Sequence, residues 1–238
     1  MKRVLLPGAV TGRVSLEGPR VHHLAVVQRV TTGERLEVFD GDGQVFDATV
    51  VSVSDEAMTL KLGEPRRVPA PRRVVVVQGL PKADKLELVL QKGTELGASG
   101  FLPAEARRSV ARLDGKVDQK LARWRRIVEE AARQCGRADV PEVMTPMALE
   151  DVELVGAATL VLDEAERAVP LSVALSGLAA DTPIALVVGP EGGLDRHEVD
   201  TLVARGAVAV TLGPLILRTE TAALAALAVI RHLEGHLG

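Results

Sequence analysis

The chain has 238 residues, of which 47% are hydrophobic and 26% charged, and its formal net charge is -3. Such values are ordinary for a globular protein, and the length suits one large domain or a small domain joined to a medium one. No apolar run reaches the roughly 18 residues that a membrane span needs. The single cysteine, Cys135, excludes an internal disulfide framework, and five scattered histidines argue against a structural metal. We expect a cytoplasmic protein without a metal site.

Charge is distributed unevenly along the chain. Residues 61–140 carry 18 Lys and Arg against 10 Asp and Glu, whereas the remaining residues carry 11 against 22. This asymmetry can mark a surface that binds a polyanion. A set of solvated helix faces would produce the same count, and the charge run alone favours that simpler interpretation.

The first 64 residues predict a small β-barrel or meander. Alternating apolar runs cover 35–39, 45–53 and 58–63, and Asp40-Gly41-Asp42-Gly43 is a strong hairpin signal between the first two. Residues 21–30 have helical spacing and would plug or flank the barrel. Residues 64–73 contain three prolines and four arginines, which predicts an extended linker and places the domain boundary there.

From Val74 onward, strand and helix patterns alternate, which predicts an α/β domain with a parallel sheet. The helices are expected at 84–96, 116–134, 170–178, 195–205 and 220–237. The strands are expected at 74–77, 99–103, 157–162, 184–188 and 207–212.

Two of these strands run directly into glycine-containing loops. Residues 184–188 precede Gly189-Pro190-Glu191-Gly192-Gly193, and residues 207–212 precede Gly213-Pro214 and the stretch up to Thr221. We expect the two strands to be neighbours, so both loops would meet at the carboxyl edge of the sheet, where ligands bind. The loops match neither the Walker A nor the G-x-G-x-x-G pattern. A tight turn would explain one such loop, but not a second that carries Arg218 and Glu220.

These loops carry a resemblance to a known family. The stretches 189–193 and 212–222, together with Lys92 to Gly97, Arg107-Arg108-Ser109, residues 130–137 and residues 23–43, resemble the E-type 16S ribosomal RNA uridine-N3 methyltransferases of the SPOUT superfamily. The resemblance covers nearly the whole chain, and its motifs are specific.

The resemblance implies a fold, a reaction and partners. The fold would be a PUA-like β-barrel in residues 1–70 and a parallel-sheet SPOUT domain in residues 71–238, with a trefoil knot at about 183–225. The reaction would be methylation of uridine N3 in small-subunit ribosomal RNA, with S-adenosylmethionine as methyl donor. The protein would act as a homodimer on ribosomal RNA or the small ribosomal subunit.

The same resemblance implies a donor pocket built from the two loops and from the loop after residue 162. An adenine ring needs an apolar slot with backbone hydrogen bonds, which leucines and glycine loops can supply. The implied cofactor-binding residues are Leu162, Glu164, Gly189, Pro190, Glu191, Gly192, Gly193, Leu212, Gly213, Ile216, Leu217, Arg218 and Thr219.

Three charged residues are candidates for catalysis. Uracil N3 carries a proton that must leave, and Glu191 or Glu220 could accept it directly or through water. Arg218 could stabilise the negative charge that develops on a uracil oxygen. A capping role at the start of the last helix explains Glu220 equally well, and a salt bridge is an alternative for Arg218.

Arginines in both halves are candidates for RNA contact, through phosphates whose binding depends on salt. The chain has no Tyr, one Trp and three Phe, so base stacking is expected to contribute little. The alternatives left open are a non-catalytic RNA-binding or ribosome-assembly module and a methyltransferase of another RNA. The candidate RNA contacts are Arg3, Arg20, Arg29, Arg107, Arg108, Arg112, Arg133 and Arg137.

Overall fold

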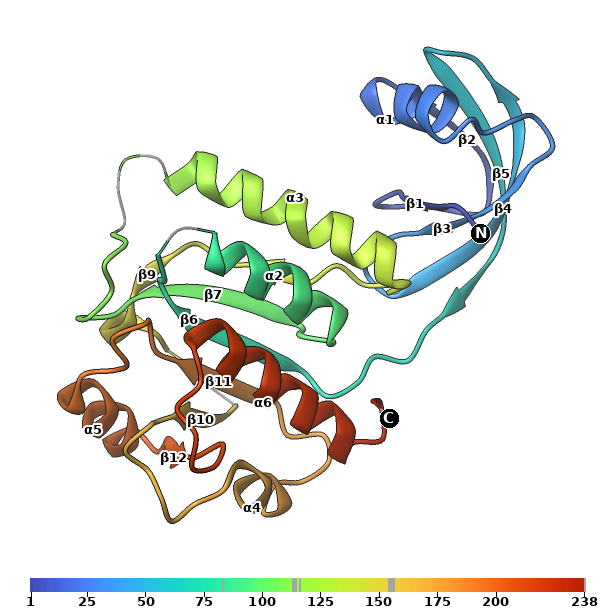
Figure 1. Ribbon diagram of the computed structural model, residues 1–238. Helices are drawn as coiled ribbons and strands as arrows, with labels where there is room; N and C mark the ends of the chain where they lie inside the picture. The colour runs from blue at the N-terminus through green and yellow to red at the C-terminus, as the bar shows by residue number, and fades with distance from the viewer. Residues whose placement is uncertain (83, 113–114, 116, 154–156, 238) are drawn as a thin grey trace. The chain divides into compact units, whose positions relative to one another are not determined.

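The computed structural model describes residues 1–82, 84–112, 115, 117–153 and 157–237, apart from the side chains of Pro19, Arg20 and His23. The chain forms two compact units. One consists of Met1–Ala70 with Ala132–Val140, and the other of Pro71–Ala131 with Pro141–Gly238. Figure 1 shows the elements of both. No helix in the described part of the chain is long and apolar enough to cross a bilayer.

The N-terminal unit is built on a five-stranded sheet in the order β1-β3-β4-β5-β2. The pairings are antiparallel except for β1 with β3. One face packs on an apolar core that includes Leu36, Val38, Val50 and Leu60. The strands are β1 (Arg3–Leu5), β2 (Gly12–Glu17), β3 (Arg35–Phe39), β4 (Gln44–Val53) and β5 (Ala57–Arg67).

The predicted hairpin between β3 and β4 is confirmed. The Asp40 carboxylate accepts hydrogen bonds from the backbone N–H groups of Asp42 (2.8 Å) and Gln44 (2.9 Å). Gly41 and Gly43 have φ of 90° and 99°, in the region that residues with a Cβ rarely adopt. The predicted helix at 21–30 is shorter and begins earlier, as α1 (Pro19–His22) and the π-helical turn η1 (His23–Val27).

The linker is shorter than the sequence predicts. β5 extends to Arg67 and includes Pro65, which pairs with Phe46 of β4. β2 pairs with β5 only as far as Leu62, so Pro65 faces no strand on its other side. A proline has no N–H to donate and is tolerated at such an edge position. The prolines of 64–73 were therefore an unreliable guide to where the strand ends.

Residues 132–140 pack with the N-terminal unit, although they begin with the last turn of the long helix α3 (Val117–Cys135), whose earlier residues belong to the other unit. The Val140 N–H donates to the Gly41 carbonyl (2.9 Å), and the Gly43 N–H donates to the Ala138 carbonyl (3.2 Å). Ala138 and Val140 also contact an apolar cluster with Phe39 and Val45. The N-terminal unit is thus composed of two segments that are distant in sequence.

The second unit contains a parallel sheet in the order β12-β10-β11-β6-β7-β8, with the short β9 beside β7. Its central strands are buried on both faces, which explains their continuous apolar runs. The strands are β6 (Val74–Gly79), β7 (Gly100–Glu105), β8 (Glu142–Val143), β9 (Met147–Ala148), β10 (Ala158–Leu162), β11 (Ile184–Val188) and β12 (Val208–Val210).

The expectation that the strands before the two glycine loops are neighbours is wrong. β10 lies between them, because Val161 pairs with Val187 of β11 on one side and with Ala209 of β12 on the other. All three strands are parallel, so their carboxyl ends still meet at one edge of the sheet. The loop after β10 therefore lies between the two glycine loops.

Helices cover both faces of this sheet (Figure 1). α2 and α6 lie on one face, where a Cβ added to Gly93 of α2 would stand 2.7 Å from Phe101 and 3.5 Å from Leu227 of α6. α5 packs on the other face through Val199 and Leu202. The helices are α2 (Lys85–Glu95), α3 (Val117–Cys135), α4 (Leu171–Ser176), α5 (Arg196–Ala204) and α6 (Thr219–Leu233), with a 3₁₀ turn η2 (Leu149–Asp151).

Candidate functional site

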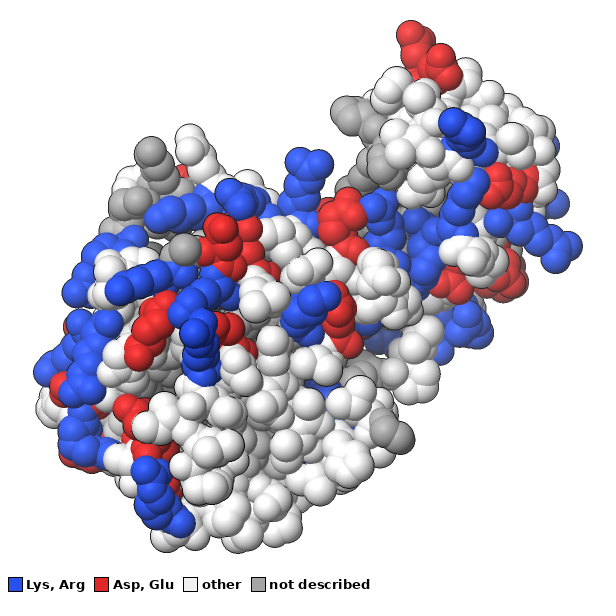
Figure 2. Space-filling model, in the orientation of Figure 1, with Lys and Arg blue, Asp and Glu red and all other residues white. Residues whose placement is uncertain are grey.

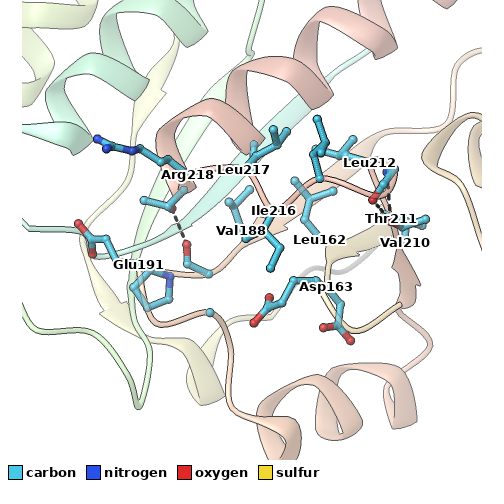
Figure 3. Close-up of a pocket in the computed structure, with 18 of the residues that line it drawn as sticks. Leu162, Asp163, Val188, Glu191, Val210, Thr211, Leu212, Ile216, Leu217 and Arg218 are labelled. Atoms are coloured by element: carbon cyan, nitrogen blue, oxygen red, sulfur yellow. Dashed lines mark hydrogen bonds between the residues drawn. The ribbon is translucent and has the colours of Figure 1, made fainter. Parts of the chain in front are cut away.

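A cavity of about 510 Å³ lies at the carboxyl ends of β10, β11 and β12 (Figure 3). Three loops line it: the loop after Leu162, residues 189–193, and residues 211–218. All thirteen residues that the sequence analysis assigns to cofactor binding lie on its wall. Nine further residues line it that were not assigned: Lys85, Asp163, Arg167, Val188, Val210, Thr211, Pro214, Leu215 and Ala222.

The loop after β11 needs its glycines because other backbone lies within contact distance. A Cβ on Gly189 would stand 2.8 Å from the Leu194 nitrogen, and one on Gly79 would stand 2.7 Å from the ring of Pro190. Gly193 has a φ of 67°, and a Cβ there would overlap the Glu164 carboxylate. The loop is therefore tightly packed between β6 and the Glu164 side chain, which fixes the cavity wall.

A buried polar network holds three elements together beside the cavity. The Gln78 side-chain amide of β6 donates to the Thr219 hydroxyl (2.8 Å), which donates to the Gly189 carbonyl (2.5 Å). Both side chains are almost fully buried, so these bonds are made away from water and are correspondingly costly to break. They link the end of β6 and the glycine loop to the first residue of α6. The sequence analysis missed Gln78, because a single polar residue at a strand end carries no local signal.

One side of the cavity is apolar. Leu162, Val188, Leu212, Ile216 and Leu217 gather there, as Figure 3 shows. Ile216 is 80% exposed, so it stands at the mouth of the cavity. An apolar wall beside loops with accessible backbone groups, in a volume of this size, suits a flat heterocyclic ligand.

The other side of the cavity is charged, and both candidate proton acceptors share one cation there. The Lys85 ammonium, at the start of α2, lies 3.0 Å from Glu191 Oε1 and 3.5 Å from Glu220 Oε2. Glu191 also accepts a hydrogen bond from the Lys82 N–H (3.0 Å). The sequence analysis missed Lys85, since one lysine at the beginning of an amphipathic helix is normally a solvated residue.

The pKa values of this pair move apart. Burial raises the pKa of Glu191. This effect is outweighed by hydrogen bonds from the backbone N–H groups of Lys82 and Glu191 and by the Lys85 ammonium, so the pKa lies below its ordinary value of 4.5. The hydrogen bond to Glu191 raises the pKa of Lys85 above its ordinary 10.5, against the effect of burial. Both groups are therefore charged at neutral pH.

Arg218 and Glu220 occupy the beginning of α6. Arg218 is exposed, and within the described part of the chain its side chain has neither a hydrogen bond nor an ion pair, so the salt bridge considered as an alternative is not formed there. Figure 3 shows Arg218 and Glu191 on the same side of the cavity, away from Leu162 and Ile216. The Arg218 side chain makes no capping bond, and Glu220 lies in the first helical turn with one carboxylate oxygen buried and without a hydrogen-bond donor among the described residues.

Three of the candidate RNA-binding arginines follow β7. Arg108 donates to the Gly192 carbonyl and to Asp195, both at 3.2 Å, so it contacts the glycine loop. The Arg112 guanidinium donates to Glu105 (3.0 Å). The Arg107 side chain is exposed and, with Arg112, lines a second cavity of about 380 Å³ between α5 and the segments that follow β7 and β9.

The remaining candidates lie in the N-terminal unit and are mostly engaged within it. Arg3 donates to Glu37 (2.6 Å), stacks on Phe39 with 4.5 Å to the ring centroid, and is only 12% exposed. Arg137 pairs with Asp139 (2.6 Å), and Arg133 is partly buried with an interaction of its own. Arg29 is exposed. The Arg20 side chain lies outside the described residues.

The fold and the cavity define an α/β protein that binds a ligand at the edge of a parallel sheet, and comparison with known families narrows this class. Residues 68–231 match the RNA methyltransferase domain, and residues 16–63 match the RNA methyltransferase PUA domain. The chain belongs to the ribosomal RNA small subunit methyltransferase E family.

Similar proteins match over most of their length. Ribosomal RNA small subunit methyltransferase E of Mycobacterium bovis is 41% identical, over 92% of this chain and 87% of the relative. The Bacillus subtilis protein of that name is 37% identical, over 92% and 89%. A crystal structure of the protein of that name from Neisseria gonorrhoeae, bound to S-adenosyl methionine, superposes with a TM-score of 0.87 at 29% identity and covers 98% of each chain.

Proposed function

We propose that the chain is an S-adenosylmethionine-dependent methyltransferase that modifies N3 of a uridine in small-subunit ribosomal RNA. The observation that carries the proposal is the cavity, whose wall contains every residue that the family resemblance assigns to the donor. Its relatives are named as small-subunit ribosomal RNA methyltransferases, and one was crystallised with the donor.

The residues on the cavity wall suit the donor. Leu162, Leu212, Ile216 and Leu217 would hold the adenine ring between apolar surfaces, and the two glycine loops would offer backbone groups to its edge. The Glu164 carboxylate, which lies against Gly193, is placed to accept hydrogen bonds from the polar part of the donor. When bound, the donor supplies a methyl group that its sulfonium already activates.

The protein's task is then to position the uridine and to remove one proton. Glu220 and Glu191 are the groups that could accept the N3 proton, directly or through water. Lys85 keeps its own proton and holds Glu191 ionised, so it acts as a fixed positive charge. Arg218 has no competing partner among the described residues and is free to stabilise the charge that forms on a uracil oxygen.

We further propose the finer features that the resemblance implies: a homodimer, a trefoil knot within about residues 183–225, and action in the cytoplasm. The hydrogen bond from the Thr219 hydroxyl to the Gly189 carbonyl supports the proposed knot, because it joins a late segment of the chain to an earlier loop. Leu215, which lines the cavity and is 77% exposed, supports a partner surface there, and the exposed Leu233 at the far end of α6 supports its continuation along the helix.

The test uses labelled donor and purified small ribosomal subunits. The wild-type protein should transfer label to one uridine, and the methyl group at N3 should stop reverse transcription at that base. Arg218→Ala should slow transfer by about 10²–10³-fold while it leaves the fold intact, because one charge-stabilising donor is lost. Arg123→Ala, an exposed arginine of α3 outside the cavity wall, is the matched control.

The alternatives predict different results. A non-catalytic RNA-binding or assembly module would bind RNA but show no calorimetric signal with the donor. A methyltransferase of another RNA would bind the donor and label transfer RNA in preference to the small subunit. Normal turnover of Arg218→Ala would remove Arg218 from the mechanism.

A further inference from the structure

The outer face of the N-terminal sheet carries a row of basic residues that the register of the strands brings into one line. Arg35 of β3 lies opposite Thr49 of β4, Thr49 lies opposite Lys61 of β5, and Lys61 lies opposite Arg13 of β2. All four residues are exposed. Their neighbours along each strand point into the apolar core instead. We call Arg35, Thr49, Lys61 and Arg13 the basic row.

The three cations of the basic row have no hydrogen bond or ion pair within the part of the chain that the structure describes. Glu37, the acidic residue next along β3 on this face, is already paired with Arg3 (2.6 Å) and Arg66 (3.7 Å). Asp47, next along β4, is the acidic side chain beside the row.

The arrangement has a cost in stability. Arg13 and Lys61 stand directly opposite each other on adjacent strands, and like charges in that position destabilise a sheet. A polyanion lying across the row would turn this repulsion into attraction. Figure 2 shows that Lys and Arg are also numerous on the drawn face of this unit.

We propose that the basic row binds the sugar-phosphate backbone of a helical segment of the RNA, an inference that rests on the proposed function and assigns its RNA contact. Strands in a sheet are about 4.8 Å apart, so the row from Arg35 to Arg13 spans roughly 14 Å, enough to contact several phosphates. This assignment differs from the arginines that the sequence suggested for this unit, of which Arg3 is buried against Phe39.

The other residues on this face of the N-terminal sheet also suit recognition of RNA through its shape and its phosphates. All four aromatic residues of the chain are buried, so no ring is available on this sheet to stack on a base. Ser15 and Thr59 lie opposite each other, two residues from Arg13 on β2 and from Lys61 on β5, and present hydroxyls beside the row. Hydroxyl groups and cations together are the usual donors to phosphate oxygens.

The test is the triple variant Arg13→Gln/Arg35→Gln/Lys61→Gln, measured by fluorescence anisotropy with a labelled RNA hairpin and no donor present. Binding should weaken at least about tenfold at low salt. The slope of log affinity against log salt should become shallower by about two to three, one for each lost phosphate contact. The thermal midpoint should stay unchanged or rise, because the Arg13–Lys61 repulsion is removed.

Two controls sharpen the result. Arg13→Lys/Arg35→Lys keeps every charge and should keep the wild-type salt slope. Donor binding by calorimetry should be the same in the triple variant and the wild type, since the cavity belongs to the other unit.

An unchanged hairpin affinity and salt slope in the folded triple variant would overturn the proposal. A loss confined to single-stranded RNA of equal length would also overturn it. Failure of the wild-type protein to bind the donor or transfer methyl groups would count against the proposed function instead, and leaves the hairpin measurement valid.

Discussion

Lys85 is a single residue on which the charged side of the cavity depends. Its ammonium lies between the carboxylates of Glu191, in the loop after β11, and Glu220, in the first turn of α6. Removing it would leave two carboxylates close to each other with no cation between them. Lys85 therefore offsets the negative charge that the two carboxylates bring to one site.

Acid titration tests this arrangement. The folded-state pKa of Glu191 lies below its ordinary 4.5, so its contribution to stability is complete above that pH and is lost as pH falls through the lowered pKa. We expect the thermal midpoint of wild type to fall more steeply below pH 4.5 than that of Lys85→Met, because the lysine contributes to the lowering. Lys92→Met, which removes an exposed pair with Glu95 on the same helix, is the control. If the thermal midpoints of wild type and Lys85→Met fall equally with pH, the backbone N–H groups of Lys82 and Glu191 hold the carboxylate without Lys85.

Single residues also mark the limit of what the sequence could predict about the site. The two glycine loops were predicted because glycines next to buried strands form a local pattern. The family resemblance then assigned thirteen residues to the donor, and all thirteen line the cavity. Gln78 and Lys85 were missed because their partners, Gly189, Thr219 and Glu191, are more than 100 residues away. No local pattern reports such distant pairs.

At the scale of elements, one buried arginine connects the end of α6 to two neighbouring segments. Arg231 donates to the Gly97 carbonyl (2.6 Å) and the Arg72 carbonyl (2.9 Å), and it pairs with Glu234. Its side chain is only 3% exposed. The end of α6 is thereby tied to the end of α2 and to the segment before β6.

Arg231→Met should destabilise the second unit by about 3–5 kcal/mol, because it leaves the Gly97 and Arg72 carbonyls without their donor. It also removes one of the two cations that pair with Glu234, the other being Arg72 (3.0 Å). Urea unfolding followed by the fluorescence of Trp124, the single tryptophan, reports this unit. Arg196→Met, which removes the two ion pairs of an arginine that is 53% exposed, should cost less than about 1 kcal/mol. Equal losses in the free energy of unfolding in the two variants would refute the role of Arg231 in holding the end of α6.

The extents of most elements were predictable, whereas their order in the sheet was not. Apolar periodicity gave α2, α3, α5 and α6 within a few residues, since burial on one side is encoded locally. The position of β10 between β11 and β12 arises from pairing between distant segments, and the strands' sequences would fit either order. The π-helical turn after α1 is likewise a local deviation that helical spacing cannot report.

At the scale of the whole molecule, the outer side of α6 supports the proposed homodimer. Val229 and Leu233 are exposed and four residues apart, so they lie on one side of the helix. Val229→Glu/Leu233→Glu should convert the dimer to a monomer, because two charges cannot be buried there without partners. Sedimentation velocity at micromolar concentration measures the change. Val203→Glu changes a valine of α5 that is 44% exposed, compared with 36% for Val229, and should leave the dimer intact. A wild-type monomer would contradict the homodimer itself.

The return of residues 132–140 to the N-terminal unit limits how this protein can be divided or recombined. Cutting the gene after residue 70 would produce a fragment in which Phe39 and Val45 lose the cover of Ala138 and Val140, and Gly41 and Gly43 lose hydrogen-bond partners. A chimaera that exchanges this unit between homologues must therefore carry both pieces. The two units are therefore poorly suited to being exchanged independently of each other.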